Sequence, residues 1–380
     1  MIVAGERSGD VYGAALAQAL RARIENAEVF GCGGEAMRAA GVETVVDLHQ
    51  VALIGISEVV SGLPKAYRAM QTLISEAAQR KPALAVLIDS PSLNLRLAKR
   101  LKQLNIPVVY FVSPQIWAWK KWRIKKIKAY VDKMLCLFDF ETEIYEKAGV
   151  PVEYVGHPLV DMATPRQTRE EFFRHAALDA DIPTVALLPG SRRSEVKLNL
   201  PTMLDAAARL AQSRPVQFVV ASAPTIDAQW LESVATRYDS VKAPVHTLRN
   251  ATHEALQYAD AAAVASGTAT IEAALRECPM IVVYRVSAFT AMCARLMIRV
   301  PFYSMVNLLA GNAAVPELIQ NDFNPDNLAS RLRLLLDDAE ARNKMVEELR
   351  RVRLRLGRGG AIERAADAIV RELDECKASQ

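Results

Sequence analysis

The chain changes from strand to helix at Val185-Ala186-Leu187-Leu188-Pro189-Gly190-Ser191-Arg192-Arg193-Ser194-Glu195. The apolar run is of strand type, and the helix signal that follows has Asn199 as its expected N-cap and Pro201 in its first turn. A glycine turn lets backbone amides approach an anion, and arginine offers a planar fork of donors. We therefore predict a phosphate site at Gly190, Ser191 and Arg192.

Strand and helix signals alternate on both sides of this turn. Apolar runs at 83–89, 107–112 and 133–138 precede it, and runs at 216–221 and 261–265 follow it. Unbroken apolar strands suit a parallel sheet that is covered on both faces. The pattern predicts an α/β chain of two Rossmann-like domains that face each other across a cleft.

The polar segment 164–169 is the expected linker between the domains. We expect an amino-terminal domain over 1–165 and a carboxyl-terminal domain over 166–345. Charge-rich helices follow over 346–380, and whether they cross back to the first domain stays open.

Composition limits the classes of function. A chain of 380 residues exceeds one ordinary core, and a formal net charge of +4 is too small to indicate nucleic acid, so no nucleic-acid partner is expected. The five cysteines are scattered and include no C-x-x-C pair, which favours reduced thiols in a cytoplasmic protein. No apolar run reaches the roughly 18 residues of a spanning helix, so any membrane contact should be peripheral.

The first candidate site is the glycine loop Gly5-Glu6-Arg7-Ser8-Gly9-Asp10. It lacks the G-x-G-x-x-G spacing of a dinucleotide site. One interpretation is a strand-to-helix turn capped by Ser8 or Asp10. The other is a site for sugar hydroxyls, in which Glu6, Ser8, Gly9 and Asp10 contact substrate.

Asp89 is the second candidate, because it ends the apolar strand 83–89. An acid at this place either caps the following helix or acts as a general base at the domain cleft. The strand position alone leaves both interpretations open.

Aromatic and basic residues combine in the third candidate, Ser113-Pro114-Gln115-Ile116-Trp117-Ala118-Trp119-Lys120-Lys121-Trp122-Arg123. Six basic residues and no acid lie between Lys120 and Lys128, beside three of the four tryptophans. A helix with solvated lysines explains the spacing but not the tryptophans. We therefore predict a membrane or lipid surface made of Trp117, Trp119, Trp122, Lys120, Lys121 and Arg123.

The fourth candidate is Ala265-Ser266-Gly267-Thr268-Ala269-Thr270-Ile271-Glu272. It reads either as a serine-capped helix with a surface acid or as a nucleotide site. Amides at Gly267 and Thr268 can bind phosphate, Ser266 adds a hydroxyl, and Glu272 can hold a ribose diol. Together with the Gly190–Arg192 turn, these residues favour a nucleotide diphosphate.

Metal chemistry is not indicated. The five histidines lack ligand spacing, and Asp179-Ala180-Asp181 lies in a polar segment. We expect no metal and no cofactor, and we expect His157 to be a hinge residue that forms hydrogen bonds.

These motifs, taken in order, resemble the lipid-A-disaccharide synthase family. The resemblance also rests on Gly156-His157-Pro158-Leu159 and Asn307-Leu308-Leu309-Ala310-Gly311, and Ser113 to Trp119 is its most specific part. It implies a GT-B glycosyltransferase that joins UDP-2,3-diacylglucosamine to 2,3-diacylglucosamine 1-phosphate. The products are the β-1,6-linked disaccharide 1-phosphate and UDP.

The resemblance also implies roles for single residues. An α-linked donor that gives a β product requires inversion, with Asp89 as the base and Glu6 or Asp10 as its rival. Arg192 and the amides of both phosphate turns would meet the diphosphate charge, and Asn307 would line the cleft. The family usually has D-x-P-D-F-N where this chain has Asp89-Ser90-Pro91-Ser92-Leu93-Asn94, so its second acid and its aromatic residue are replaced.

Acyl chains need an apolar landing zone, for which Val51 to Ile56, Val59, Val60 and Leu63 are candidates, with burial in the core as the alternative. With the tryptophan–lysine segment they would form a peripheral surface on the cytoplasmic face of an anionic inner membrane.

Competing interpretations of the whole chain are a UDP-N-acetylglucosamine epimerase, a peptidoglycan glycosyltransferase and a non-catalytic nucleotide- or lipid-binding paralogue. The oligomeric state is left open.

Overall fold

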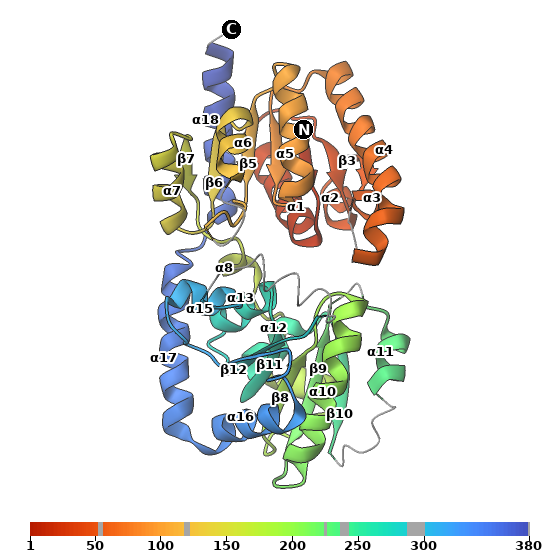
Figure 1. The fold of residues 1–380 in the computed structure, drawn as a ribbon, viewed down its shortest axis with the longest axis vertical. Coiled ribbons are helices and arrows are strands. Elements are labelled where there is room, and N and C mark those ends of the chain that lie inside the picture. Colours follow the sequence, from red (N-terminus) through yellow and green to blue (C-terminus); the bar gives the residue numbers. More distant parts are fainter. Residues whose placement is uncertain (52–55, 118–121, 224–225, 236–242, 287–300, 379–380) are drawn as a thin grey trace. The chain divides into compact units, whose positions relative to one another are not determined.

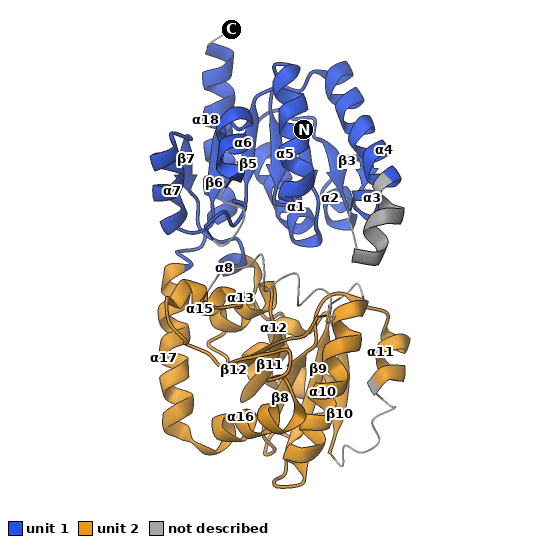
Figure 2. Cartoon of the chain, viewed as in Figure 1, with its two compact units in different colours: residues 1–161, 356–380 blue, residues 162–355 orange. Residues whose placement is uncertain are grey.

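The computed structural model describes residues 1–51, 56–117, 122–223, 226–235, 243–286 and 301–378, with the backbone alone for 56–63 and 235. The chain forms two compact units (Figure 2). Unit 1 comprises residues 1–161 and 356–380, and unit 2 comprises residues 162–355. Each unit contains a parallel sheet between layers of helices (Figure 1), which is the predicted α/β class.

Unit 1 is built on a parallel sheet whose strand order is β3-β2-β1-β4-β5-β6-β7. The strands are β1 (Ile2–Ala4), β2 (Phe30–Gly33), β3 (Glu43–Asp47), β4 (Ala85–Ile88), β5 (Val108–Phe111), β6 (Lys133–Cys136) and β7 (Val152–Tyr154). The central strands β1, β4 and β5 are buried along their whole length, because helices cover both faces.

Helices connect these strands in the usual β-α-β manner. They are α1 (Arg7–Arg21), α2 (Glu35–Ala39), α3 (Leu48–Val51), α4 (Ile56–Arg80), α5 (Pro91–Gln103), α6 (Arg123–Tyr130) and α7 (Phe140–Ala148), and the short α8 (Leu159–Met162) follows the last strand. Val3, Leu87 and Tyr110 point from one sheet face into a core shared with α4, α5 and α6. On the other face α1 packs closely, because a Cβ on Gly9 would lie 3.3 Å from the Cβ of Ala4.

Unit 2 repeats the architecture with the strand order β10-β9-β8-β11-β12-β13. Its strands are β8 (Thr184–Leu188), β9 (Gln217–Ser222), β10 (Val245–Arg249), β11 (Ala261–Ala265), β12 (Met280–Tyr284) and β13 (Glu317–Ile319). Its helices are α9 (Arg169–His175), α10 (Arg193–Ala211), α11 (Ala228–Ala235), α12 (Thr252–Tyr258), α13 (Thr268–Leu275), α15 (Met305–Ala310), α16 (Pro325–Asp337) and α17 (Ala339–Arg355).

Each sheet reverses its strand order at one place. In unit 1 the reversal lies between β1 and β4, and in unit 2 it lies between β8 and β11. Ligands of open parallel sheets bind outside the carboxyl ends of the strands at such a switch point. Ligands are therefore expected at the turns after β1 and β4 in unit 1 and at the turns after β8 and β11 in unit 2.

The carboxyl-terminal helices belong to different units. Helix α17 lies in unit 2, whereas α18 (Ala361–Ala378) lies in unit 1 and packs against α1. Arg23, two residues after the end of α1, holds α18 through ion pairs with Glu363 at 2.7 Å and Asp367 at 2.6 Å. The units divide between residues 161 and 162 and between 355 and 356, compared with the expected divisions at 165 and 345.

One helix start differs from the prediction. Helix α10 begins at Arg193, and Pro201 lies inside it. Asn199 is therefore not an N-cap; it is fully buried, and its Nδ2 donates to the carbonyl of Pro189 at 2.9 Å. Glu195 closes the first turn instead, through a capping box with Arg192.

Candidate functional site

The switch point of unit 1 brings the turns after β1 and β4 into contact. A Cβ on Gly5 would lie 2.3 Å from Oγ of Ser90, so only glycine fits there. Glu6, the N-cap of α1, and Asp89 follow these two strands, and the charge of Glu6 acts on the carboxyl of Asp89. The sequence-predicted Glu6 and Asp89 thus lie at one edge of one sheet.

Asp89 has an unusual backbone. Its φ is 49° and that of Ser90 is 45°, so two successive residues other than glycine are left-handed. Strand β5 and helix α5 hold this turn. The N–H of Asp89 donates to the Phe111 carbonyl at 3.0 Å. The Asp89 carbonyl accepts from Nδ2 of Asn94 at 2.8 Å and from the Tyr110 hydroxyl at 2.5 Å. Such conformations persist only where surrounding contacts enforce them, and they gather at functional sites.

The environment also changes the acidity of Asp89. Burial raises the pKa of its carboxyl to about 6, the negative charge of Glu6 adds to this, and the N–H of Ser90 opposes it. A carboxyl with a pKa near the working pH is suited to taking a proton. The side chain is half-buried, and it remains within reach of solvent at the carboxyl end of β4.

Ser8, Gly9 and Asp10 do not form an open loop, since α1 already begins at Arg7. Gly9 is buried against β1, and Ser8 lies half-buried in the first helical turn. Asp10 is 5% exposed, and its carboxylate accepts the N–H groups of Gly34 at 2.6 Å and of Ala36 and Met37 at 3.1 Å. Asp10 is thus an anchor for α2, and this geometry argues against Gly9 and Asp10 as substrate contacts.

The tryptophan–lysine segment divides into different environments. Trp122 is 56% exposed, with Nζ of Lys126 lying 5.0 Å from the centroid of its ring. Arg123 is 5% exposed, and its Nη2 lies 3.5 Å from Oγ of Ser92, so its prediction as a surface residue is wrong. Trp119, Lys120 and Lys121 lie outside the described residues.

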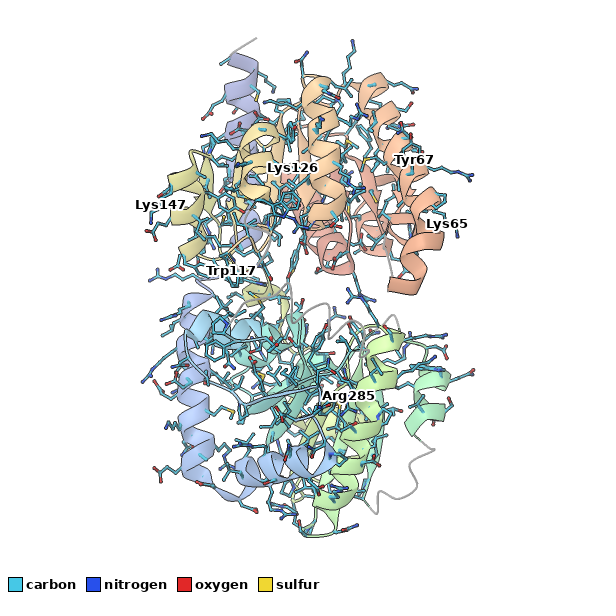
Figure 3. The ribbon with its side chains drawn as sticks, viewed as in Figure 1. Lys65, Tyr67, Trp117, Lys126, Lys147 and Arg285 are labelled. Carbon is cyan, nitrogen blue, oxygen red and sulfur yellow. The ribbon has the colours of Figure 1, made fainter. Side chains whose placement is uncertain are left out.

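Trp117 is half-buried and held by α7. Its Nε1 donates to Oε1 of Glu141 at 3.2 Å, and its ring meets Phe140 edge-to-face at 5.3 Å. Figure 3 labels Trp117 and, on α6, Lys126.

Of the apolar landing zone, Val51 is buried in the core, and the side chains of 52–63 lie outside the described residues.

His157 is buried, and its Nδ1 accepts the N–H of Leu159 at 3.2 Å. Burial lowers the pKa of its imidazole to about 4. The ring therefore packs as a neutral group against Phe138, at a centroid distance of 5.7 Å.

The turn after β8 in unit 2 is organised by Glu195. Its Oε2 accepts the N–H of Ser191 at 2.9 Å and that of Arg192 at 3.2 Å, and its Oε1 pairs with Nη1 of Arg192 at 2.9 Å. Gly190 has φ +126°, and a Cβ there would lie 2.6 Å from Glu195. The Ser191 amide thus donates to a carboxylate of the chain, whereas the Arg192 side chain is 55% exposed.

The turn after β11 differs, because it presents a helix start. Gly267 is the N-cap of α13, with φ 154° and no atom within 4 Å of an added Cβ. Gly267 and Thr268 are exposed, and the first N–H groups of a helix have no partner within it. Ser266 donates from Oγ to the carbonyl of Tyr303 at 3.0 Å, so it braces this turn.

Glu272 lies one turn into α13 and is half-buried. Its Oε1 is 3.7 Å from Nε2 of His253 on α12, and this carboxylate raises the pKa of His253. Glu272 is thus held at the same switch point as the α13 amides.

Asn307 does not line an open surface. It is fully buried, its Nδ2 donates to the Val315 carbonyl and to Oε1 of Glu317, and its Oδ1 accepts the Val315 N–H, each at 2.9 Å. Glu317 also accepts the N–H groups of Tyr303 and Ser304. Asn307 therefore braces the segment that supports Ser266, which corrects its prediction as a cleft residue.

Sequence reasoning gave no role to several residues of these edges. Arg285, labelled in Figure 3, follows β12; it donates to Oγ1 of Thr202 at 2.7 Å and to the Phe323 carbonyl. Glu195 stood in the quoted motif without a role, and nothing in the pattern marked His253 or Glu141.

Among the described residues no group of three or more His, Cys, Asp or Glu could hold a metal ion, and no helix is long and apolar enough to cross a membrane.

Comparison with known proteins identifies the family. The family described as lipid-A-disaccharide synthetase matches residues 1–370. The chain belongs to this family. A lipid-A-disaccharide synthase of Myxococcus xanthus is 44% identical over 371 residues, which is 97% of this chain and 96% of the relative. One of Solibacter usitatus is 41% identical with the same coverage. The chain is thus a glycosyltransferase of lipid A biosynthesis.

Solved structures agree on the fold, which is GT-B as predicted. The UDP-GlcNAc 2-epimerase of Neisseria meningitidis, solved with UDP-GlcNAc, has a TM-score of 0.62 at 12% identity and covers 98% of this chain and 99% of its own. Acinetobacter baumannii MurG has a TM-score of 0.58 at 14% identity, covering 98% of each chain. At such identities the likeness concerns the fold alone, and the family match disfavours the epimerase, peptidoglycan and non-catalytic alternatives.

Proposed function

We propose that this glycosyltransferase of the lipid-A-disaccharide synthetase family transfers the sugar of UDP-2,3-diacylglucosamine to the 6-hydroxyl of 2,3-diacylglucosamine 1-phosphate. The acceptor oxygen bonds to the anomeric carbon of the donor while the bond from that carbon to the UDP oxygen breaks. The configuration inverts from α to β, the hydroxyl proton goes to a base, and UDP leaves with the electron pair.

Unit 2 holds the donor in this proposal. The exposed amides at the start of α13, at Gly267 and Thr268, and the guanidinium of Arg192 meet the diphosphate charge. Glu272 accepts the ribose hydroxyls. The position of both turns at the switch point of one parallel sheet supports the assignment.

Unit 1 supplies the base, and we assign it to Asp89. The observation that carries this assignment is the pair of left-handed residues, Asp89 and Ser90, enforced at the carboxyl end of β4 beside the charge of Glu6. A protein tolerates such backbone strain where it positions a reacting group. Glu6 tunes the acidity of Asp89 in this proposal and is not itself the base.

The membrane contact is also a proposal. The support is an exposed Trp122 that stacks with Lys126, together with the exposed Lys125 and Lys128 of α6. Aromatic and basic groups on one face favour the surface of an anionic membrane, here the cytoplasmic face of the inner membrane. Trp122→Ala should weaken binding to anionic vesicles, and salt should weaken it further; equal binding to neutral vesicles in high salt would contradict the electrostatic part.

The reaction is tested with both lipid substrates in EDTA. We expect disaccharide and UDP in equal amounts, and we expect both only when the 1-phosphate acceptor is present. Tight UDP binding without disaccharide would overturn the proposed function. Product that requires an added divalent ion would overturn the assignment of the diphosphate charge to Arg192 and the α13 amides.

A further inference from the structure

A buried acid in unit 1 has no part in the mechanism above. Glu141, the second residue of α7, is 1% exposed. Its Oε1 accepts the indole N–H of Trp117 at 3.2 Å, and its Oε2 accepts the N–H of Phe138 at 3.4 Å. A carboxylate is buried at high cost unless hydrogen bonds hold it. Its donors come from the neighbouring loop and from the start of its own helix.

The neighbouring loop consists of residues 113–117 and is tied to α7 at both ends. Oγ of Ser113 lies 2.9 Å from the hydroxyl of Tyr145, which belongs to α7. Between the two ends, Ile116 is 3% exposed and packs into the core. Helix α7 thus holds the first residue of this loop through Tyr145 and the last residue through Glu141.

This loop starts beside Asp89. Strand β5 pairs with β4 up to Ile88 and Phe111, and the next residue, Val112, has φ 70°. A β-branched residue in the left-handed region is a genuine outlier, so the exit from β5 is strained in the same way as the exit from β4. The N–H of Val112 donates to the Leu135 carbonyl at 3.2 Å, and the contacts of α7 with Ser113 and Trp117 hold the residues that follow.

We propose that Glu141 is a positioning residue that fixes the loop 113–117, and with it the indole of Trp117, at the edge of the sheet where Asp89 lies. The inference rests on the proposed function in assigning this edge to the acceptor. Glu141 acts through Trp117 and touches no reacting atom. Its loss should therefore impair use of the acceptor and leave UDP binding unchanged.

The charge of Glu141 changes near neutral pH. Burial raises the pKa of its carboxyl to about 7, while hydrogen bonds from Ser113 and Trp117 lower it. The other titratable groups that face it are Cys136 on β6 and Tyr145 on α7; burial raises the pKa of both, so both stay neutral there. The indole of Trp117 consequently loses a charged acceptor when Glu141 is protonated.

The first test follows tryptophan emission from pH 5 to 9 in the full chain. We expect a transition near pH 7 in the unaltered protein that is absent in Glu141→Gln and in Trp117→Phe. Glu143→Gln is the matched control, because Glu143 lies on the same helix and is exposed beside Lys147. A transition that persists in Trp117→Phe or in Glu141→Gln would overturn the contact as the cause. This readout does not depend on the reaction.

The second test measures kinetics of the same variants. Glu141→Gln and Trp117→Phe should each raise KM for the acceptor about tenfold, the effect of one lost charge-assisted hydrogen bond. The double variant should cost no more than either single one, because both remove the same contact. Unchanged acceptor KM in both single variants would overturn the positioning role. Trp117→Phe keeps the carboxylate and the ring, so it decides the question if Glu141→Gln fails to fold.

Discussion

The carboxylate of Glu195 lies 2.9 Å from Nη1 of Arg192 and also accepts the N–H of the same residue at 3.2 Å. The two residues stand three apart at the start of α10, where the chain leaves β8. The carboxylate of Glu195 thus accepts the backbone N–H groups of the turn, while the side chain of Arg192 stays 55% exposed. An internal anion keeps the turn formed before a ligand arrives, which lowers the ordering cost of binding.

The first prediction concerns Arg192. Arg192→Ala should lower kcat/KM by ~10²–10³, as loss of one donor to developing charge does elsewhere. Glu195→Ala should lower it about tenfold, because the turn loosens while the guanidinium remains. Arg193→Ala is the control, because Arg193 stacks over the ring of Trp230 at 5.3 Å and should change the rate little. Equal losses for Arg192 and Arg193 would argue against the assigned role.

A second prediction uses pH. The base must be ionised, so kcat should rise as pH increases through about 6, the pKa of Asp89. The negative charge of Glu6 contributes to raising this pKa, so Glu6→Gln should move the acidic limb to lower pH without abolishing turnover. A limb that stays in place, or moves to higher pH, would contradict the coupling between the two acids.

The third prediction separates a structural acid from a reactive one. Asp10→Ala removes the acceptor of three N–H groups at the start of α2, two of them buried, and should lower the free energy of unfolding by ~2 kcal/mol or more. Denaturant unfolding measures this. In the fraction that remains folded, UDP affinity should be unchanged; a stable Asp10→Ala protein without turnover would instead return Asp10 to the catalytic site.

Glu272 gives the fourth prediction. Glu272→Gln should weaken UDP binding about tenfold, as expected for loss of a charged acceptor from a hydroxyl donor. With 2′,3′-dideoxy-UDP the unaltered protein and the variant should bind equally, because the hydroxyls are gone. Calorimetry of both nucleotides measures the difference, and a penalty that remains with the dideoxy analogue would refute the ribose contact.

Local sequence patterns predicted the fold well, because an apolar strand or a glycine turn can be recognised from a few consecutive residues. The runs at 83–89 and 261–265 became β4 and β11, and Asp89 and the turns at 190–192 and 266–268 follow the carboxyl ends of strands, as predicted. Helix α10 starts six residues before the predicted N-cap Asn199, because the side chain of Asn199 bonds to the Pro189 carbonyl from inside the helix.

Long-range polar contacts could not be predicted in this way. Asp10 and Asn307 look like site residues. Asp10 instead binds backbone N–H groups up to 27 positions away, and Asn307 binds the backbone of Val315 and the carboxylate of Glu317. Arg123 belongs to a basic run but turns inward toward Ser92. Glu141 looks like a surface acid at a helix start, and only the packing of α7 against the loop 113–117 shows that it is buried.

The most direct test of the account is single-turnover transfer by Asp89→Asn, compared with Glu6→Gln, at saturating donor and acceptor. We predict that Asp89→Asn binds UDP normally and loses at least ~10³ of the rate, within the range lost with a general base, while Glu6→Gln keeps most of it. Because burial raises the pKa of Asp89, its charge costs stability above pH 6, so Asp89→Asn should also unfold at a higher temperature at pH 8. Near-normal turnover by Asp89→Asn would contradict the account, as would a complete loss with Glu6→Gln.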